Sequence, residues 1–362
     1  MDPTELRAAF PLLARVAYLN AGTDGPVAGV AVAAAVAELE RERDEGRTLP
    51  HFERRHELAS AQRERYAALL GANADDVALT TSTTDGVATA LAGLPLSPGD
   101  EILCAEGEHP GLLGPLQAAR DLRGVEVRFV PLARLADSIG PRTRVVTCAH
   151  VAWRTGELAP VEALASLGDD GPAVLYDGAQ AVGAIPVDVD ELRCAVYAGS
   201  GQKWLCGPDG TGMLYVAPAW RSRIAVTRRG YQSFADAGAG IDGALREEAC
   251  SYDTPALPAE ASAFAVAALE LLAGFGWDAL FARADELASE LTLRLAKRGI
   301  AVAQRGDSTL VSWHSADPPA IKARLADAGV VIRDLPGTDL VRASVGAWNN
   351  EDDLERLARA VG

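Results

Sequence analysis

Lysine is scarce in this chain, and one of its three lysines lies where a reactive amine could be held. Lys203 falls within residues 199–204 (GSGQKW), a small and apolar run, whereas Lys297 and Lys322 lie among charged residues in helix-like segments. An amine removed from water loses its proton more easily and can form a Schiff base with a carbonyl compound. A lysine beside Trp204 could equally lay its stem on the ring and extend its charge into solvent. The local sequence leaves both interpretations open.

A carboxylate and an amide follow the strand-like run 173–176. Asp177 and Gln180 are the first and last residues of the sequence DGAQ. A carboxylate at such a place can keep a heterocyclic nitrogen protonated, and a positive ring draws electrons from a bound substrate. Asp before Gly more often forms an Asx-turn or a helix N-cap, so Asp177 alone does not decide between a catalytic and a structural role.

Two further segments follow strand-like runs. Residues 80–86 (TTSTTDG) place hydroxyls and free N–H groups before a helix-like segment, which favours phosphate binding, although ordinary helix capping predicts the same residue types. His109, in residues 108–111 (EHPG), could stack on a flat ring or carry protons, although a lone histidine is more often structural. Residues 207–212 (GPDGTG) precede a strand instead of following one, so we expect a tight turn and not a dinucleotide loop.

The elements that must position these residues alternate along the chain. Short β-branched runs between helix-like stretches predict an α/β unit with a largely parallel sheet, whose ligands gather at the carboxyl ends of the strands. The tail, with alanine- and leucine-rich helices, strand-like runs at 309–313 and 340–344 and a last helix at 350–361, predicts a smaller α+β unit. The runs of the first unit are 77–80, 101–104, 125–130, 144–147, 173–176, 196–198 and 213–216.

Composition excludes several classes of protein. The net charge of −16 disfavours partners with a phosphate backbone or an anionic bilayer, so we expect no nucleic acid and no membrane. Residues 1–5 lack a basic region before an apolar run, and no stretch approaches the ~20 apolar residues of a membrane span, so we expect a cytoplasmic location. The five scattered cysteines form no C-x-x-C pair, and we expect no metal site.

Together and in this order, these segments resemble the class V aminotransferase family of fold-type I pyridoxal 5'-phosphate (PLP) enzymes, from about residue 18 to 357. The resemblance implies an α/β fold with a mainly parallel seven-stranded sheet in a large PLP-binding domain (21–245). It also implies a smaller C-terminal α+β domain (246–362), with an N-terminal segment (1–20) that packs on it. The matching segments are 18–20 (YLN), 83–86 (TTDG), 108–109 (EH), 177–180 (DGAQ), 200–204 (SGQKW), 341–344 (VRAS) and 348–349 (WN).

The resemblance also implies roles for individual residues. Lys203 would form the Schiff base with PLP and move protons at the substrate Cα, Asp177 would pair with the pyridinium nitrogen, and His109 would stack on the ring. Arg342 would bind the substrate α-carboxylate, with Asn20 also on the substrate side. Gln180 would hold the phenolic oxygen, and the phosphate would be bound by Thr83, Thr84, Ser200 and Gln202 and, from the other subunit of a homodimer, by Thr254.

Two positions depart from the family pattern. Gln202 stands where the family commonly has histidine, and Arg154 stands where it commonly has asparagine. Gln202 can still donate a hydrogen bond to a phosphate. Arg154 either adds a second cation for a substrate carboxylate or points away, and the sequence does not decide between these.

The reaction is the least determined part of the prediction. Residues 331–339 contain no cysteine, whereas the family's cysteine desulfurases carry their nucleophile there, which disfavours a desulfurase. The strongest resemblance within the family is to cystine/cysteine C–S lyases, in residues 10–12, 108–112, 150–153 with 155–156, and 332–333. It implies β-elimination through a quinonoid intermediate. An amino-acid epimerase or aminotransferase acting on a longer or peptide-like substrate, and a PLP-binding regulatory module without chemistry, stay open as alternatives.

Overall fold

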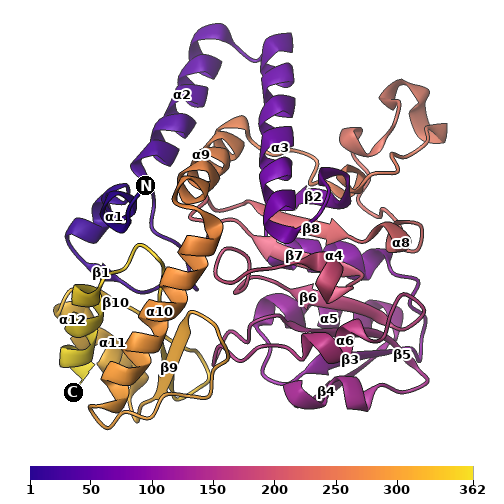
Figure 1. The fold of residues 1–362 in the computed structure, drawn as a ribbon. Helices are drawn as coiled ribbons and strands as arrows, with labels where there is room; N and C mark the ends of the chain where they lie inside the picture. Colours follow the sequence, from indigo (N-terminus) through magenta and orange to yellow (C-terminus); the bar gives the residue numbers. More distant parts are fainter. Residues whose placement is uncertain (362) are drawn as a thin grey trace.

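The computed structural model describes residues 1–361, and its larger part is built on one seven-stranded sheet (Figure 1). The strand order is β2-β8-β7-β6-β5-β3-β4. All neighbouring strands are parallel except β8, which is antiparallel to both β2 and β7. This architecture confirms the predicted fold class. The strands are β2 (Val77–Thr80), β3 (Glu101–Ala105), β4 (Glu126–Val130), β5 (Thr143–Ala149), β6 (Ala173–Asp177), β7 (Val196–Ser200) and β8 (Gly212–Val216).

Apart from the edge strand β4, the strands of the sheet are largely buried on both faces, which is why they read as nearly continuous apolar runs. Along β6, Val174 and Tyr176 join the hydrophobic cluster on one face, and Leu175 joins the cluster on the other. Helix α4 (Thr83–Gly93) packs closely on the second face, where a Cβ at Gly86 would lie 3.0 Å from the Cβ of Ala198. The expected turn at residues 207–212 joins β7 to its antiparallel neighbour β8.

The C-terminal part has its own small sheet and core. Its strands β11 (Arg333–Asp334), β12 (Leu340–Ser344) and β9 (Leu310–His314) form an antiparallel sheet in the order β11-β12-β9. Helices α10 (Trp277–Ala296), α11 (Pro318–Asp327) and α12 (Glu351–Val361) accompany it. Near the N-terminus, β1 (Ala17–Tyr18) pairs in parallel with β10 (Val330–Val331), and Asn20 bridges to Ser344. The domain limits 1–20, 21–245 and 246–362 stay a prediction.

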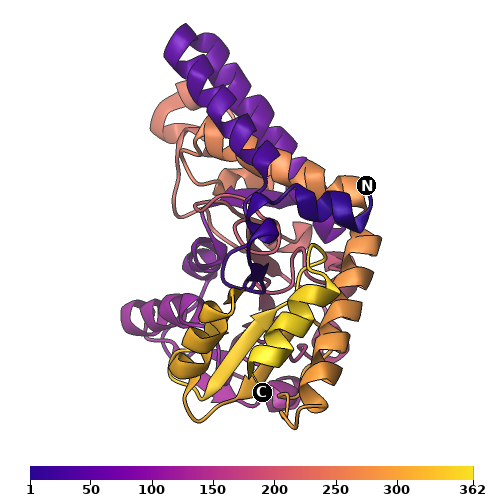
Figure 2. The ribbon, with the colours of Figure 1, turned by 90° about the vertical axis from the view of Figure 1, so that its left-hand side faces the viewer.

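Two long helices each pack on a third beside the large sheet. The helical pair α2 (Gly29–Glu45) and α3 (Leu49–Leu70) projects from the molecule, and α9 (Ala259–Phe275) lies against its base (Figures 1 and 2). Among residues 1–361 no single helix is long and apolar enough to cross a membrane. Only α9 and α10 taken together pass that test, across a bend of 79°.

Apart from α5, the remaining elements are short. The other α-helices are α1 (Pro3–Ala8), α5 (Pro110–Arg123), α6 (Val161–Ala165), α7 (Val189–Leu192) and α8 (Pro218–Arg221). The 3-10 helices are η1 (Pro11–Ala14), η2 (Ala74–Asp76), η3 (Leu132–Arg134), η4 (Ala136–Ser138), η5 (Tyr231–Ser233), η6 (Ala237–Asp242) and η7 (Ala249–Tyr252).

Candidate active site

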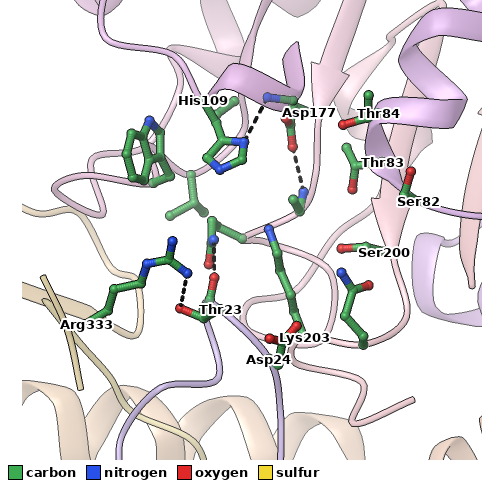
Figure 3. Close-up of a pocket in the computed structure, with 18 of the residues that line it drawn as sticks. Thr23, Asp24, Ser82, Thr83, Thr84, His109, Asp177, Ser200, Lys203 and Arg333 are labelled. Atoms are coloured by element: carbon green, nitrogen blue, oxygen red, sulfur yellow. Dashed lines mark hydrogen bonds between the residues drawn. The ribbon is translucent and has the colours of Figure 1, made fainter. Parts of the chain in front are cut away.

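A cavity of about 340 Å³ opens at the carboxyl ends of β5, β6 and β7. It gathers residues from both ends of the chain, because the N-terminal segment and the small C-terminal sheet meet the large sheet there (Figure 3). The lining residues that carry polar or charged groups are Thr23, Asp24, Ser82, Thr83, Thr84, His109, Trp153, Asp177, Gln180, Ser200, Gln202, Lys203, Arg333 and Arg342.

Lys203 lies in a loop that the N-terminal segment covers. The N–H of Gly25 donates to the Gln202 carbonyl at 2.7 Å, and a Cβ at Gly25 would lie 2.1 Å from the Lys203 carbonyl oxygen, so only glycine permits this contact. Burial lowers the pKa of the Lys203 amine to about 8, against an opposing effect of the Asp177 carboxylate. The amine is therefore much closer to its neutral, nucleophilic form than a surface lysine is.

Asp177 ends β6 with its carboxylate in the cavity. The residue is only 6% exposed, and its Oδ1 accepts a hydrogen bond from the Ala179 N–H at 2.9 Å. Burial raises the pKa of this carboxyl group, and Lys203 acts in the opposite direction. A buried carboxylate with one hydrogen bond and a cation in the same cavity is suited to hold a second cationic group.

Gln180 is held from two sides. Its Nε2 donates to the Gly22 carbonyl at 2.7 Å, and its Oε1 accepts from the Trp204 indole N–H at 3.1 Å. One N–H of the side-chain amide is left to donate to a ligand, because the amide has two.

His109 caps helix α5 and presents a neutral ring to the cavity. Its Nδ1 accepts a hydrogen bond from the Gly111 N–H at 3.0 Å, so the neutral ring carries its proton on Nε2. Burial, together with the cations Lys203 and Arg342, lowers the pKa of His109 to about 4. The edge of its ring meets Trp153, with ring centroids 5.0 Å apart and planes at 88°. A fixed, uncharged imidazole can cover one face of a flat ligand.

Several polar atoms of the cavity lack partners. Within residues 1–361, Thr83 Oγ1, Ser200 Oγ and Gln202 Oε1 are buried without a hydrogen bond. They lie beside the start of α4, where Ser82 Oγ accepts from the Asp85 N–H at 3.1 Å. Figure 3 shows Ser82, Thr83 and Ser200 on one side of Lys203 and Arg333 on the other. Because buried polar groups are normally paired, these atoms and the helix N-terminus indicate a place for an anionic group.

Two arginines reach the cavity from the small sheet. Arg342 is 2% exposed and donates from Nη1 to the Trp153 carbonyl at 2.6 Å. Burial and the nearby Arg333 lower the pKa of Arg342 to about 9. Arg333 donates from Nη1 to the Thr23 hydroxyl at 3.2 Å. Neither arginine forms an ion pair with a carboxylate in the described part of the chain, so both can receive an anionic ligand.

The structure leaves three of the predicted site residues outside the cavity lining. Asn20 accepts from the Thr23 hydroxyl at 2.9 Å, behind the lining segment. The Arg154 guanidinium lies over the Trp153 ring, 5.3 Å from its centroid. Thr254 donates to the Asp85 carboxylate at 2.8 Å and borders a second cavity of about 820 Å³.

Sequence reasoning missed five polar lining residues as site candidates, namely Thr23, Asp24, Ser82, Trp153 and Arg333. Ser82 lies in residues 80–86, which the sequence analysis considered for phosphate binding. Arg333 lies in residues 332–333, which resemble C–S lyases. The sequence therefore pointed to both segments but not to these side chains. No pattern in the sequence marked Thr23 or Asp24.

Thiols and metal ligands do not contribute to this cavity. Cys104, Cys148, Cys194 and Cys206 are buried, Cys250 borders the second cavity, and none lines the first. Burial raises the pKa of the Cys206 thiol. Among residues 1–361 there is no cluster of three or more side chains suited to hold a metal ion.

Comparison with known proteins gives a consistent result. Residues 20–357 match the family model described as aminotransferase class-V. An isopenicillin N epimerase of Streptomyces clavuligerus is 27% identical over 83% of this chain and 82% of its own length. A probable cysteine desulfurase of Pseudomonas aeruginosa is 30% identical over 85% and 83%. The solved complex of the cystine C–S lyase C-DES with its product cysteine persulfide superposes with a TM-score of 0.90 at 28% identity, over 97% and 99%.

Proposed function

This chain belongs to the aminotransferase class-V family, and on that premise we propose that it cleaves the Cβ–S bond of a cystine-type amino acid by β-elimination. The observation that carries the proposal is a cavity with one lysine and two arginines and, within the described chain, no thiol. The family's cofactor is PLP, and its relatives include cysteine desulfurases and C–S lyases.

The residues present fit PLP. The unpaired buried groups of Thr83, Ser200 and Gln202 beside the α4 N-terminus match a phosphate, and Asp177 matches a protonated pyridine nitrogen. Thr84, the residue after Thr83 in α4, would donate its hydroxyl to the phosphate. The free N–H of the Gln180 amide would donate to the phenolic oxygen. Lys203 would attach the aldehyde covalently.

Each residue around the cofactor would have a separate role in the removal of the substrate Cα proton. When bound, PLP withdraws the electron pair that remains when the substrate Cα loses its proton. Lys203 Nζ accepts this proton, because its lowered pKa leaves a large neutral fraction near pH 8. Asp177 stays ionised against the positive ring. His109 would cover one face of the ring and exclude water without adding charge.

The arginines would hold the substrate by its ends. Arg342, buried and fixed by the Trp153 carbonyl, binds the α-carboxylate of the reacting amino acid. Arg333 lies farther toward Thr23 and binds a second carboxylate, such as that of the other half of cystine. Arg154 and Asn20 would act indirectly, since Arg154 packs on Trp153 and Asn20 anchors Thr23.

The products follow from the bonds that change. Loss of the Cα proton is followed by cleavage of the Cβ–S bond, and the departing sulfur carries away the electron pair. Cystine and one water thus give pyruvate, ammonia and cysteine persulfide. No step transfers sulfur to an enzyme thiol, which agrees with a cavity that the described cysteines do not reach.

We also propose that the enzyme is a homodimer with shared sites. Leu49, Phe52 and Tyr231 are 68%, 50% and 75% exposed around the second cavity, where Thr254 also lies. An apolar rim of this kind is suited to burial against a second copy, and it would bring Thr254 toward the partner's phosphate site. Light scattering of the purified protein at micromolar concentration, compared with a Phe52→Glu variant, tests this assembly.

An epimerase of longer amino acids is the second candidate, favoured by the relative from Streptomyces clavuligerus. Arg333 would then hold the remote carboxylate of the longer substrate. Epimerisation requires a proton donor on the face of the substrate opposite Lys203. The lowered pKa of His109 makes it a poor donor near neutral pH, so we rank this second.

A direct assay separates the reactions. The purified holoenzyme is given cystine, cysteine or a longer dicarboxylic amino acid, with and without a keto acid, and pyruvate, persulfide and α-proton exchange with D2O are measured. β-Elimination predicts pyruvate from cystine without a keto acid. Exchange without pyruvate indicates an epimerase, and turnover only with a keto acid indicates an aminotransferase. If no added amino acid changes the absorbance of the bound cofactor, the protein is a binding module.

A further inference from the structure

Asp24 places a carboxylate in the cavity, and no step of the proposed reaction involves this carboxylate. Its backbone is fixed on both sides, because its N–H donates to the Asn20 carbonyl at 3.2 Å and its carbonyl accepts from the Tyr18 hydroxyl at 2.9 Å. The next N–H, that of Gly25, donates to the carbonyl of Gln202 in the lysine loop. The side chain is thus held at the margin of the cavity near Lys203 (Figure 3).

The carboxylate of Asp24 has no protein partner. Within residues 1–361 it takes part in no hydrogen bond and no ion pair, although it lines the cavity. Partial burial and the charge of Asp209 raise the pKa of Asp24, while Lys203 and Arg333 act against this rise. A carboxylate that nearby cations stabilise without direct contact is available to a ligand.

Arg333 is a second charged residue that lines the cavity, and its charge acts on Asp24 as that of Lys203 does. It donates to the hydroxyl of Thr23, the residue before Asp24, yet it forms no ion pair with the Asp24 carboxylate. A cation and a carboxylate, neither of them in an ion pair within the described residues, therefore line the same cavity. The α-amino-acid end of a substrate, which we call its head, carries the complementary pair of a carboxylate and an ammonium group on one carbon atom.

We propose that Asp24 binds the ammonium group of the distal amino-acid head of the substrate while Arg333 binds its carboxylate. This inference rests on the proposed function and narrows its substrate class to two α-amino-acid heads joined through sulfur. A dicarboxylic or peptide-like substrate without that ammonium leaves Asp24 facing a carboxylate or nothing. Asp24 is therefore a specificity-determining residue, and the reacting head does not need it.

A matched pair of substrates isolates this contact. Cystine and the mixed disulfide of cysteine with 3-mercaptopropionate share the reacting head, the disulfide and the distal carboxylate, and differ only in the distal ammonium. Cystine has two equivalent heads, so a statistical factor of two is removed first. The kcat/KM for pyruvate release is measured with the wild-type holoenzyme and with Asp24→Asn, Asp24→Glu and Asp209→Asn.

The expected result is a change in preference and not in overall activity. The wild type prefers cystine by about tenfold, the size of one charged hydrogen bond. Asp24→Asn brings the preference close to one by slowing cystine alone, Asp24→Glu restores part of it, and Asp209→Asn keeps it because Asp209 does not line the cavity. An unchanged preference in Asp24→Asn, or an equal loss for both disulfides, overturns the inference.

A binding measurement keeps this test separate from the test of the reaction. Dissociation constants of both disulfides are measured by calorimetry on the holoenzyme. If neither disulfide releases pyruvate, β-elimination is wrong, and the dissociation constants then decide the role of Asp24 alone. Equal affinities of the wild type for the two disulfides, or absence of binding, overturn the inference.

Discussion

Arg333 and Arg342 are direct partners across the antiparallel ladder between β11 and β12. Opposite residues of an antiparallel pair project to the same face, so the ladder brings two guanidinium groups to one side of the small sheet. Like charges in this arrangement are destabilising, and neither arginine has a carboxylate partner in the described chain. The pair is therefore a preformed receptor for anionic ligands, and its two members differ in depth.

Replacement of each arginine separates the two ends of the substrate. Arg342→Met should lower kcat/KM by at least about 100-fold for every amino acid, because a bidentate charged contact is lost. Arg333→Met should lower it by about tenfold or more for cystine. It should leave the mixed disulfide of cysteine and ethanethiol, which has a single carboxylate, within about twofold. Equal losses for both substrates in Arg333→Met would contradict the assignment of a second carboxylate site.

Lys203→Ala should remove both the covalent attachment and the base. We expect loss of the near-visible absorbance of bound PLP and a fall in kcat of at least about 1000-fold. Borohydride reduction of the wild type, followed by peptide mass spectrometry, should place the cofactor on Lys203. Lys297→Ala, at an exposed position, is the matched control. Turnover at the original rate in Lys203→Ala would contradict the assignment of Lys203 as the PLP-binding residue and the base.

The pKa of Lys203 predicts how the apoprotein takes up its cofactor. Burial lowers this pKa from 10.5 to about 8, and only the neutral amine attacks an aldehyde. The rate of covalent PLP incorporation, followed by stopped-flow absorbance, should therefore rise with pH through about 8 and level off above it. A rate that keeps rising through pH 10 would mean that the amine titrates as a surface lysine does.

At Gly22 three segments of the chain meet too closely for a side chain. A Cβ there would lie 2.7 Å from Ser344 Oγ, 2.8 Å from Gln180 Oε1 and 2.9 Å from Arg342 Nη2. Gly22→Ala should displace Gln180 and Arg342, raise KM and lower the thermal midpoint of the holoenzyme. Gly274→Ala, in helix α9 with nothing within 4 Å, should instead raise that midpoint slightly, because alanine favours the helix. A Gly22→Ala enzyme with normal KM would refute this crowding.

Glu108 makes stability depend on pH. Its Oε1 accepts from the Ala149 N–H at 2.8 Å, and burial together with Asp177 raises its pKa from 4.5 to about 8. The folded protein therefore keeps a proton that the unfolded chain releases, so this group's contribution to stability is lost as pH rises from 4.5 to 8. Glu108→Gln should remove that loss, on the order of a few kcal/mol.

Urea unfolding of the apoprotein at pH 5.5 and pH 8 measures this effect. The free energy of unfolding of Glu108→Gln, relative to the wild type, should be larger at the higher pH. An equal difference at both pH values would show that Glu108 is ionised throughout.

The elements of the large domain could be predicted closely. The run 173–176 became β6 (Ala173–Asp177), and the other six runs also fall on strands, because strands covered on both faces need continuous apolar residues. The residues after these strands could be found as well. Parallel strands place their carboxyl ends at one edge, so Asp177, Ser200 and Lys203 had to lie near one another.

The peripheral charges could not be assigned in the same way. Arg154 and Arg333 read as similar arginines in the sequence, yet Arg154 lies over Trp153 and Arg333 lines the cavity. The difference arises from the register of a two-residue strand and from the direction of one loop. Both depend on contacts between segments that are far apart in the chain.

By itself, the sequence determined the α/β fold, which follows from local apolar patterns. Its ordered motifs also identified the family, and through that resemblance the lysine-centred cofactor chemistry. Only the tertiary structure decided which charges meet the substrate. Asp24, Arg333 and Arg342 share one cavity because the N-terminal segment and the small sheet close over the large one, and this packing has no local signature.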